Sequence, residues 1–410
     1  MRKIVAAVMA TRVIAFTLVS LITQIALTCA TSAQESVKIG ILSDLSGPYA
    51  EIAGKSAIVA AKLAISDFGG NVLGRPIEMV SADHQNKADA GLAIAREWLD
   101  ARGVTAILDV NNSAVALAVN ELVRSKKRIL LARATSDDLT QKACSPDTTT
   151  QWVASSGGLA RAVILPAARE GLDNWYFITV NYAFGHTLEE QGKKAVASAQ
   201  RKVVGAVRFP GGASDFASYI LEAQSKGAKT IAIAAAGAEM ASIVKQIREF
   251  GLTAEVVPFY LAEPDVDAVG QGLLAGLRSA VTFYWNRSSE SRAFAARFKA
   301  QGGRLPTFAG QQQYSAVMHY LKAVQAAATT DAAAVSTKMR ELPVEDASGY
   351  RASVRGDGRV MNAMFAVTVK QANQTKGEWD FFSETAVINA DELYPSADAQ
   401  LCPLVAKEVK

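Results

Sequence analysis

The sequence predicts an α/β fold built from parallel sheets in two lobes. Short apolar strands alternate with amphipathic helices along most of the chain, which is the pattern of parallel sheets with helices on both faces. Strands such as 231–235 are apolar at successive positions, as expected when both faces of a sheet are covered. Without a leader of residues 1–33, about 377 of the 410 residues remain, too many for one ordinary core and suitable for two domains.

Residues 1–33 have the three parts of a secretory signal peptide. Arg2 and Lys3 carry positive charge, an apolar stretch covers about residues 13–27, and small residues lead up to Ala33. We expect cleavage after Ala33. An uncleaved membrane anchor is the alternative, but the apolar run is shorter than the roughly 20 residues that a membrane span needs.

The charge of the mature chain argues against nucleic acid as a partner. The leader holds three of the 43 Lys and Arg and none of the 39 Asp and Glu, so its removal lowers the formal charge from +4 to about +1. A nearly neutral chain lacks the basic excess that attracts phosphate backbones.

Cleavage of the leader also removes Cys29 and leaves Cys144 and Cys402 as the two thiols of the mature chain. Exported proteins fold under oxidising conditions, so we expect a disulfide between these two cysteines. Two unpaired thiols are the alternative, because the sequence does not show how close the two residues lie.

The mature chain opens with a strand at 37–42, a turn at Gly47 and Pro48, and a helix with amphipathic spacing at Gly54–Phe68. Further strands are predicted at 77–81, 106–110, 128–132, 174–180, 202–209, 230–235 and 256–261. Further helices are predicted at 88–101, 113–125, 185–200, 214–226 and 238–250.

After residues 281–284 the pattern changes. Three helices are predicted at 290–301, 311–328 and 331–341, followed by a late strand at Met364–Lys370. Two strand–helix runs followed by helices and a returning strand indicate two lobes, with the chain crossing between them more than once.

Six short segments, in the same order along the chain, resemble the periplasmic solute-binding proteins of the branched-chain amino acid (Leu/Ile/Val-binding) class, which supply ABC importers. The segments are Ile39–Pro48, Asp67–Pro76, Asp83–Asn86, Ala134–Thr140, Tyr182–Gly185 and Ser214–Phe216. The resemblance covers essentially the whole mature chain. It implies the type I periplasmic binding protein fold, in which two doubly wound parallel-sheet lobes are joined by three hinge crossovers and hold one ligand between them.

The resemblance also implies where the lobes divide and what they bind. Lobe 1 is expected to comprise residues 34–153 and 284–357, and lobe 2 residues 154–283 and 358–410. The hinges are expected near 152–155, 282–286 and 355–360. The family likeness further implies a periplasmic monomer that passes a small molecule to an ABC transporter permease.

In open parallel sheets the ligand lies beyond the carboxyl ends of the strands. Asn111, Asn112 and Ser113 follow the strand 106–110 and precede a helix, so their side chains can either cap that helix or face a ligand. Both possibilities stay open from the sequence.

The loop after the strand 128–132 is the second candidate in the first lobe. The resemblance places backbone and hydroxyl contacts to a ligand carboxylate at Arg133, Ala134, Thr135 and Ser136. Arg133 departs from the small residue expected in relatives. In a cleft it can pair bidentately with an acid group, which favours an acidic or aromatic-acid ligand; pointing to solvent is the equal alternative.

Aromatic and acidic residues are the candidates elsewhere. The resemblance implies that Tyr182 or Phe184 covers the ligand, although Phe184 can equally be a core residue. It also implies that Glu263, or Asp265 two residues later, neutralises a ligand ammonium. Tyr49, in the first loop, is either a wall of the site or a surface aromatic.

An enzyme is disfavoured, and we expect no catalytic residue, metal or cofactor. His84, His186 and His319 lie far apart without metal-ligand spacing or a neighbouring thiol. We expect the periplasmic substrate-binding component of an ABC importer that captures a branched-chain or other amino acid, or an aromatic or organic acid. The alternatives are an extracytoplasmic sensor that presents its closed form to a signalling partner and, less favoured, a hydrolase.

Overall fold

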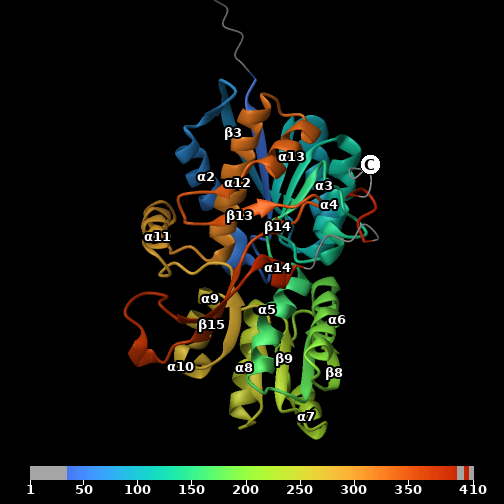
Figure 1. Cartoon of the computed structure of the whole chain (residues 1–410), viewed down its shortest axis with the longest axis vertical. Coiled ribbons are helices and arrows are strands. Elements are labelled where there is room, and N and C mark those ends of the chain that lie inside the picture. The colour runs from blue at the N-terminus through green and yellow to red at the C-terminus, as the bar shows by residue number, and fades with distance from the viewer. Residues whose placement is uncertain (1–34, 395–400, 406–410) are drawn as a thin grey trace, which may run out of the picture. The chain divides into compact units, whose positions relative to one another are not determined.

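The computed structural model describes residues 35–394 and 401–405 of the chain (Figure 1). The predicted leader and its cleavage position lie outside the described residues. No helix in the described ranges has both the length and the apolar character that a bilayer span requires.

The first sheet has six strands in the order β2-β3-β1-β4-β5-β6, and only the short β2–β3 pair is antiparallel. The strands are β1 (Val37–Ser43), β2 (Asn71–Val72), β3 (Arg75–Asp83), β4 (Val104–Asp109), β5 (Ile129–Ala132) and β6 (Thr149–Gln151). Its helices are η1 (Ala50–Gly54), α2 (Lys55–Phe68), α3 (Ala88–Ala101), α4 (Ser113–Lys126) and η2 (Asp137–Thr140).

Both faces of the first sheet are buried, as the apolar strands predicted. Ile39, Ile41 and Leu131 belong to one core cluster, whereas Leu42 and Leu130 belong to another on the opposite face. This division follows from the two-residue period of a strand, because successive side chains point to opposite faces.

The second sheet is parallel and has four strands in the order β10-β9-β7-β8. The strands are β7 (Trp175–Val180), β8 (Val203–Phe209), β9 (Thr230–Ala234) and β10 (Glu255–Pro258). Its helices are α5 (Ser156–Arg169), α6 (Ala183–Ser198), α7 (Ala217–Ser225), α8 (Gly237–Glu249), α9 (Glu263–Val269) and α10 (Gln271–Leu274). Two parallel sheets with helices confirm the α/β class.

The described part of the last third of the chain adds three long helices and two small antiparallel sheets. It contains α11 (Ser289–Gly302), α12 (Phe308–Ala327), which packs on α2, and α13 (Ala332–Glu341). The strands form the sheets β12-β13-β14 and β11-β15-β16, and β11 precedes the three long helices in the chain. Their bounds are β11 (Arg278–Val281), β12 (Val344–Glu345), β13 (Arg351–Val354), β14 (Val360–Met361), β15 (Met364–Val369) and β16 (Phe382–Ile388), with η3 (Ala372–Gln374) and α14 (Ala390–Leu393).

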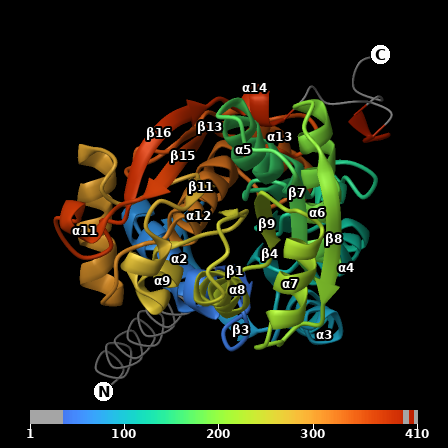
Figure 2. The ribbon, with the colours of Figure 1, turned by 90° about the horizontal axis from the view of Figure 1, so that it is seen from below.

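The chain passes three times between the two large sheets, and two of the passages lie side by side. Gln151 is bridged in parallel to Arg359, and its backbone N–H donates to the Gly358 carbonyl at 2.8 Å. The guanidinium of Arg359 reaches back to the carbonyl of Val153, with an Nη1–O distance of 2.7 Å. Helix α14, which follows β16, packs on α5 as seen in Figure 2. The residue limits of the lobes stay a prediction.

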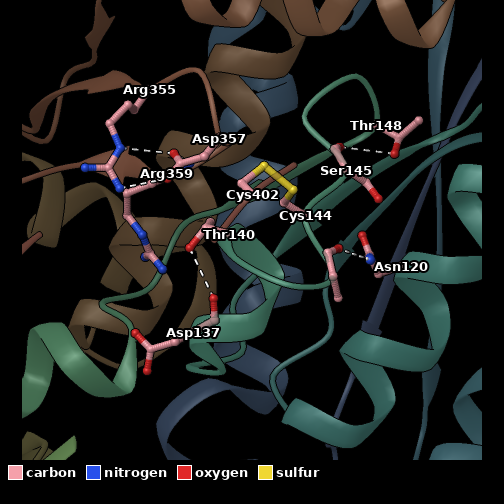
Figure 3. The surroundings of a disulfide bond; sticks show 11 residues. Asn120, Asp137, Thr140, Cys144, Ser145, Thr148, Arg355, Asp357, Arg359 and Cys402 are labelled. Carbon is pink, nitrogen blue, oxygen red and sulfur yellow. Dashed lines mark hydrogen bonds and ion pairs between the residues drawn. A yellow bond between two sulfur atoms is a disulfide. The ribbon is translucent and has the colours of Figure 1, made fainter. Parts of the chain in front are cut away.

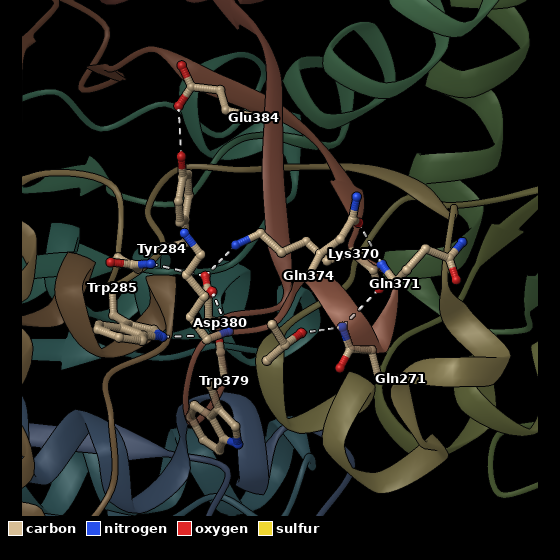
Figure 4. Close-up of polar contacts among 12 residues, drawn as sticks. Gln271, Tyr284, Trp285, Lys370, Gln371, Gln374, Trp379, Asp380 and Glu384 are labelled. Carbon is tan, nitrogen blue, oxygen red and sulfur yellow. Dashed lines mark hydrogen bonds and ion pairs between the residues drawn. The ribbon is translucent and has the colours of Figure 1, made fainter.

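The loop between β15 and β16 touches the chain that follows β11 (Figure 4). Trp285 Nε1 donates to the Trp379 carbonyl at 3.0 Å, and Asn286 Nδ2 donates to Asp380 Oδ1 at 3.0 Å. Lys370 forms an ion pair with the same Asp380 carboxylate. The loop also reaches α11 through an ion pair of Glu378. These bonds fasten the antiparallel sheet to α11 and its preceding segment.

A disulfide joins Cys144, after η2, to Cys402 near the end of the chain, with 5.8 Å between the Cα atoms (Figure 3). Both cysteines are buried. The bond spans 258 residues of sequence, and restricting so long a loop in the unfolded chain stabilises the fold by an amount on the order of 5 kcal/mol in a polymer-entropy treatment.

Candidate functional site

The ends of three neighbouring strands in the first sheet bring the candidate loops together. Leu42 in β1 is in register with Asp109 in β4, and Asp109 is in register with Ala132 in β5. The loops that leave the carboxyl ends of these three strands therefore lie at the same end of the sheet. They carry Tyr49, Asn111–Ser113 and Arg133–Ser136. This is the edge where open parallel sheets bind ligands.

One cavity at this edge is lined from both large sheets. Its walls are formed by Tyr49, Ile52, Ala53, Asn111, Ser113, Arg133, Thr135, Phe184 and Tyr260. Six of these residues were predicted to face a ligand, and Tyr260 was not. Asn112, Ala134, Ser136, Tyr182, Glu263 and Asp265 were predicted as well but are not among the lining residues. Whether the lining residues bind a ligand stays a prediction.

The first loop places Tyr49 through the carboxylate of Asp44. Asp44 Oδ1 accepts from the backbone N–H of Gly47 at 2.7 Å, and Oδ2 accepts from that of Tyr49 at 3.0 Å. The expected turn at Gly47 and Pro48 is thus closed by a side chain that acts as a local cap. Tyr49 is 6% exposed, so the surface-aromatic alternative is wrong.

Aromatic side chains form the wall between the two sides of the cavity. The hydroxyl oxygens of Tyr49 and Tyr182 are 2.9 Å apart and share a hydrogen bond. Phe184 packs edge-on against Tyr49 and Tyr260, with ring centroids 6.1 and 6.3 Å apart. Burial raises the pKa of Tyr182 to about 12, so its hydroxyl keeps its proton at neutral pH.

The two sides also meet at backbone. A Cβ atom on Gly237, at the start of α8, would lie 2.7 Å from the carbonyl oxygen of Pro48, and the residue has a φ of 58°. Both facts restrict this position to glycine. The free space in the cavity is about 10 Å³, roughly what one water molecule needs. A solute of several heavy atoms therefore fits only if the walls of the cavity move apart.

Arg133 is not at the surface. Its side chain is 2% exposed, its Nε donates to Asp109 Oδ1, and its backbone N–H donates to the Asp109 carbonyl at 2.6 Å. The alternative in which Arg133 points to solvent is therefore wrong. Two polar atoms of the pair, Arg133 Nη1 and Asp109 Oδ2, are buried without a hydrogen-bond partner among the described residues.

Besides Tyr260, the sequence did not point to Asp109, the ion-pair partner of Arg133. The only signal was an acidic residue at the end of the apolar strand β4. Asp109 and Val110 have φ values of 76° and 45°, which is costly for side-chain-bearing residues and most of all for a β-branched valine. Hydrogen bonds on both sides hold this conformation, since Val110 N–H donates to the Leu42 carbonyl at 2.8 Å.

The two asparagines at this strand end have different roles. Asn112 Oδ1 accepts from the Val115 N–H at 2.9 Å and caps α4, so the capping alternative holds for Asn112. Asn111 instead lines the cavity, its Oδ1 accepts from Asp44 N–H at 3.1 Å, and its Nδ2 is buried without a described partner.

His84 fixes the orientation of the Asn111 amide. His84 Nδ1 accepts from the Asn86 N–H at 3.1 Å, so the ring proton is on Nε2, which lies 2.9 Å from Asn111 Oδ1 and donates to it. Asn111 Oδ1 thus accepts two hydrogen bonds, from the Asp44 N–H and from His84 Nε2. The Nδ2 group is the part of the side chain that can donate to another partner.

In the loop after β5, only Thr135 lines the cavity besides Arg133. The carbonyls of Ala134 and Ser136 both accept from Gln151 Nε2, at 2.5 and 2.9 Å, and the Thr135 carbonyl accepts from the Ser156 N–H at 2.7 Å. Ala134 and Ser136 therefore fasten the loop to the first passage between the sheets.

Glu263 and Asp265 lie in the first turn of α9, directly after the loop that carries Tyr260. Asp265 Oδ2 accepts from the Ala262 N–H at 2.8 Å, whereas both carboxyl oxygens of Glu263 are buried without a described partner. Burial raises the pKa of Glu263 to about 8 and that of Asp265 to about 7. Across the described ranges, no group of three His, Cys, Asp or Glu side chains is placed to hold a metal ion.

Comparison with known proteins agrees with this architecture. Residues 36–376 match the family described as periplasmic binding protein. A periplasmic binding protein from Burkholderia mallei is 36% identical, with 89% of this chain and 98% of that chain covered and a TM-score of 0.86. A branched-chain amino acid ABC transporter periplasmic ligand-binding protein from Burkholderia xenovorans LB400 is 35% identical, with 88% and 97% covered and a TM-score of 0.80.

A solute-binding protein of an ABC transporter from R. palustris, solved in complex with benzoate, shares the fold at 18% identity, with a TM-score of 0.77 and 87% and 97% of the chains covered. No match was found among curated proteins. The family match and the identities above 30% confirm the resemblance drawn from the six sequence segments. The chain belongs to the periplasmic binding protein family and has its type I fold.

Proposed function

We propose that this protein is the substrate-binding component of an ABC importer, which captures a small carboxylate-bearing solute between its lobes in the periplasm and delivers it to a permease. The observation that carries the proposal is the cavity lined from both large sheets, in which two buried donors, Arg133 Nη1 and Asn111 Nδ2, have no described partner. Buried polar groups without a partner are rare because they are costly, so a ligand oxygen is their natural acceptor.

The roles of the lining residues follow from their chemistry. A solute carboxylate would accept from Arg133 Nη1 and Asn111 Nδ2, and the hydroxyls of Ser113 and Thr135 would take further lone pairs. Ser113 also begins α4, whose N-terminus carries a partial positive charge. Phe184 would cover the apolar part of the solute.

The second lobe would close on the solute once the first lobe holds it. Tyr182 and Phe184 lie on α6 or at its N-cap, and Tyr260 follows β10. Contacts that exist only when both lobes engage the solute would favour the closed form over an open one. The hinges would lie near 152–155, 282–286 and 355–360. Of the two acids predicted for the first turn of α9, Glu263 is our candidate for a ligand contact, because Asp265 already accepts a backbone bond.

The names of relatives and fold neighbours support both amino acids and aromatic acids as candidate ligands. One relative is named as a branched-chain amino acid transporter component, and a fold neighbour from Thermotoga maritima is named as a leucine-binding protein. Other neighbours were solved with benzoate, 3,4-dihydroxybenzoic acid and 4-hydroxybenzoate.

The test is a thermal-shift screen of the mature protein, residues 34–410, against amino acids, aromatic acids and short aliphatic acids, followed by calorimetric titration of each stabilising compound. A solute that binds only the folded protein stabilises it by about 2.7 kcal/mol at a concentration of one hundred times Kd. We expect a saturable rise in melting temperature with at least one carboxylate-bearing class. Failure of every class to shift the melting temperature and to give binding heat would overturn the proposal.

A further inference from the structure

We propose that Asp109 is a specificity-determining residue, which by neutralising Arg133 sets the cavity to accept a carboxylate-bearing solute that also carries a positive charge and to reject a simple organic anion. The inference rests on the proposed function and names the substrate class of the same site. It reverses the expectation that Arg133 by itself favours an acidic or aromatic-acid ligand.

The ion pair at the cavity wall consists of two buried charges of opposite sign. Arg133 is 4% exposed and Asp109 is fully buried, and the two form a direct ion pair. The pair is balanced before any solute arrives. A lone carboxylate placed against it would leave one uncompensated negative charge in a buried site, and a buried charge without a partner is strongly unfavourable. A solute with its own ammonium group adds no net charge.

Both signs of charge lie at or directly behind the cavity wall. Arg133 lines the cavity, and its ion-pair partner Asp109 lies behind it and is not itself a lining residue. Arg133 Nη1 and Asp109 Oδ2 are both buried without a partner among the described residues. The lining residue Tyr260 feels charges of both signs. Burial is the main cause of its raised pKa; among the charges, Arg133 lowers the pKa, whereas Asp265 and Asp109 raise it. A dipolar site of this kind matches a dipolar head group.

Asp109 also fixes the orientation of the Arg133 side chain. The Nε–Oδ1 bond and the backbone bond from Arg133 N–H to the Asp109 carbonyl hold the arginine from two directions. Asp109 itself is held in a left-handed conformation, with a φ of 76°. Strain at a strand end that faces a cavity is a mark of a functional position.

The test uses matched pairs of solutes that differ only in the amino group: L-leucine with 4-methylpentanoate, and L-phenylalanine with 3-phenylpropanoate, together with benzoate. Calorimetric titration gives the ratio of affinities within each pair. In the wild-type protein we expect the amino acid of at least one pair to bind ten-fold or more tightly than its partner.

The variant Asp109→Asn keeps an oxygen acceptor for Arg133 Nε and the size of the side chain but removes the negative charge. We expect the ratio to fall by at least ten-fold, with the simple acid binding more tightly than it does to wild type. Asp100→Asn is the matched control, because Asp100 makes an exposed ion pair with Lys126 away from the cavity; its ratio should equal that of wild type.

Two results would overturn the inference and leave the proposed function standing: benzoate or a deaminated acid binding wild type as tightly as the best amino acid, or Asp109→Asn leaving the ratio unchanged. The wild-type ratio needs no variant, so the inference can be refuted even if Asp109→Asn fails to fold. Absence of binding by every carboxylate in the wider screen would instead overturn the proposed function, and the inference with it.

Discussion

Two arginines are buried in the described part of the chain, and their hydrogen bonds differ. One lines the cavity, and the other lies beside the passages between the sheets. Arg359 is 1% exposed; its Nη1 donates to the Val153 carbonyl, its Nη2 donates to Gln151 Oε1, and its guanidinium lies 4.9 Å from the ring centroid of Tyr394. No buried nitrogen of Arg359 is left without a partner in the described ranges. Arg133, by contrast, leaves Nη1 without one.

The acids beside the two arginines differ in the same way. Asp357 accepts from the Arg359 backbone N–H at 3.0 Å and forms an ion pair with Arg355 at 2.7 Å (Figure 3). Asp109 has one oxygen bonded to Arg133, and its other oxygen has no partner in the described part of the chain. A buried polar group that is fully bonded stabilises the fold, and one that is left unpaired is costly unless another molecule completes it. We call Arg359 and Asp357 with their bonded neighbours the structural cluster, and Arg133 and Asp109 the recognition cluster.

The largest effect is expected at Glu263, whose two carboxyl oxygens are both buried without a partner among the described residues. Its pKa is raised to about 8 in the folded protein from an ordinary 4.5, so between these values the folded state keeps a proton that the unfolded chain has released. The free energy of unfolding should therefore fall as pH rises from about 4.5 to about 8, by up to about 1.4 kcal/mol per pH unit.

Glu263→Gln should remove this part of the pH dependence, because the amide does not titrate. Urea denaturation at several pH values between 4.5 and 8.5 measures it, with Glu255→Gln as the control for an exposed glutamate. Asp265 also has a raised pKa and interacts with Glu263, so a weaker slope of the same sign should remain in Glu263→Gln. Parallel curves for wild type and Glu263→Gln would contradict the assignment.

A smaller loss is expected for Arg359→Lys. An ammonium cannot serve the Val153 carbonyl and Gln151 Oε1 in the same planar geometry, nor stack on Tyr394 as a guanidinium does. Leaving one of these buried acceptors unpaired should cost about 1–3 kcal/mol of folding stability. Denaturation measures the loss, and titration with the solute found in the screen should give an unchanged Kd. A clear change in Kd with unchanged stability would remove the distinction between the two clusters.

The sequence predicted most strands and helices of the two large sheets, because these elements follow simple apolar periods. It missed α5, whose Gly157, Gly158 and Pro166 weaken the helical pattern. It also missed β16, whose inner residues are exposed and polar and so lack an apolar alternation.

In the site, the loops after the strands were predictable and the pairing between them was not. Arg133 was identified from its place after a strand, but its partner Asp109 lies on a neighbouring strand and is brought opposite by register. Tyr260 was missed because nothing in its loop distinguishes it from a core aromatic. Asn112 caps its own helix through Val115, three residues away, whereas the place of Asn111 depends on a hydrogen bond from the Asp44 N–H, 67 positions away.

The most direct test of the account is a calorimetric titration of wild type and Arg133→Lys with the same solute. Lysine keeps the positive charge beside Asp109, so the buried pair and the folding stability should be retained, but it cannot offer a second nitrogen to the cavity. We expect Kd to rise by ten-fold or more, which corresponds to about 1.4 kcal/mol or more. An unchanged Kd would show that Arg133 does not contact the solute and would contradict the division between a recognition arginine and a structural one.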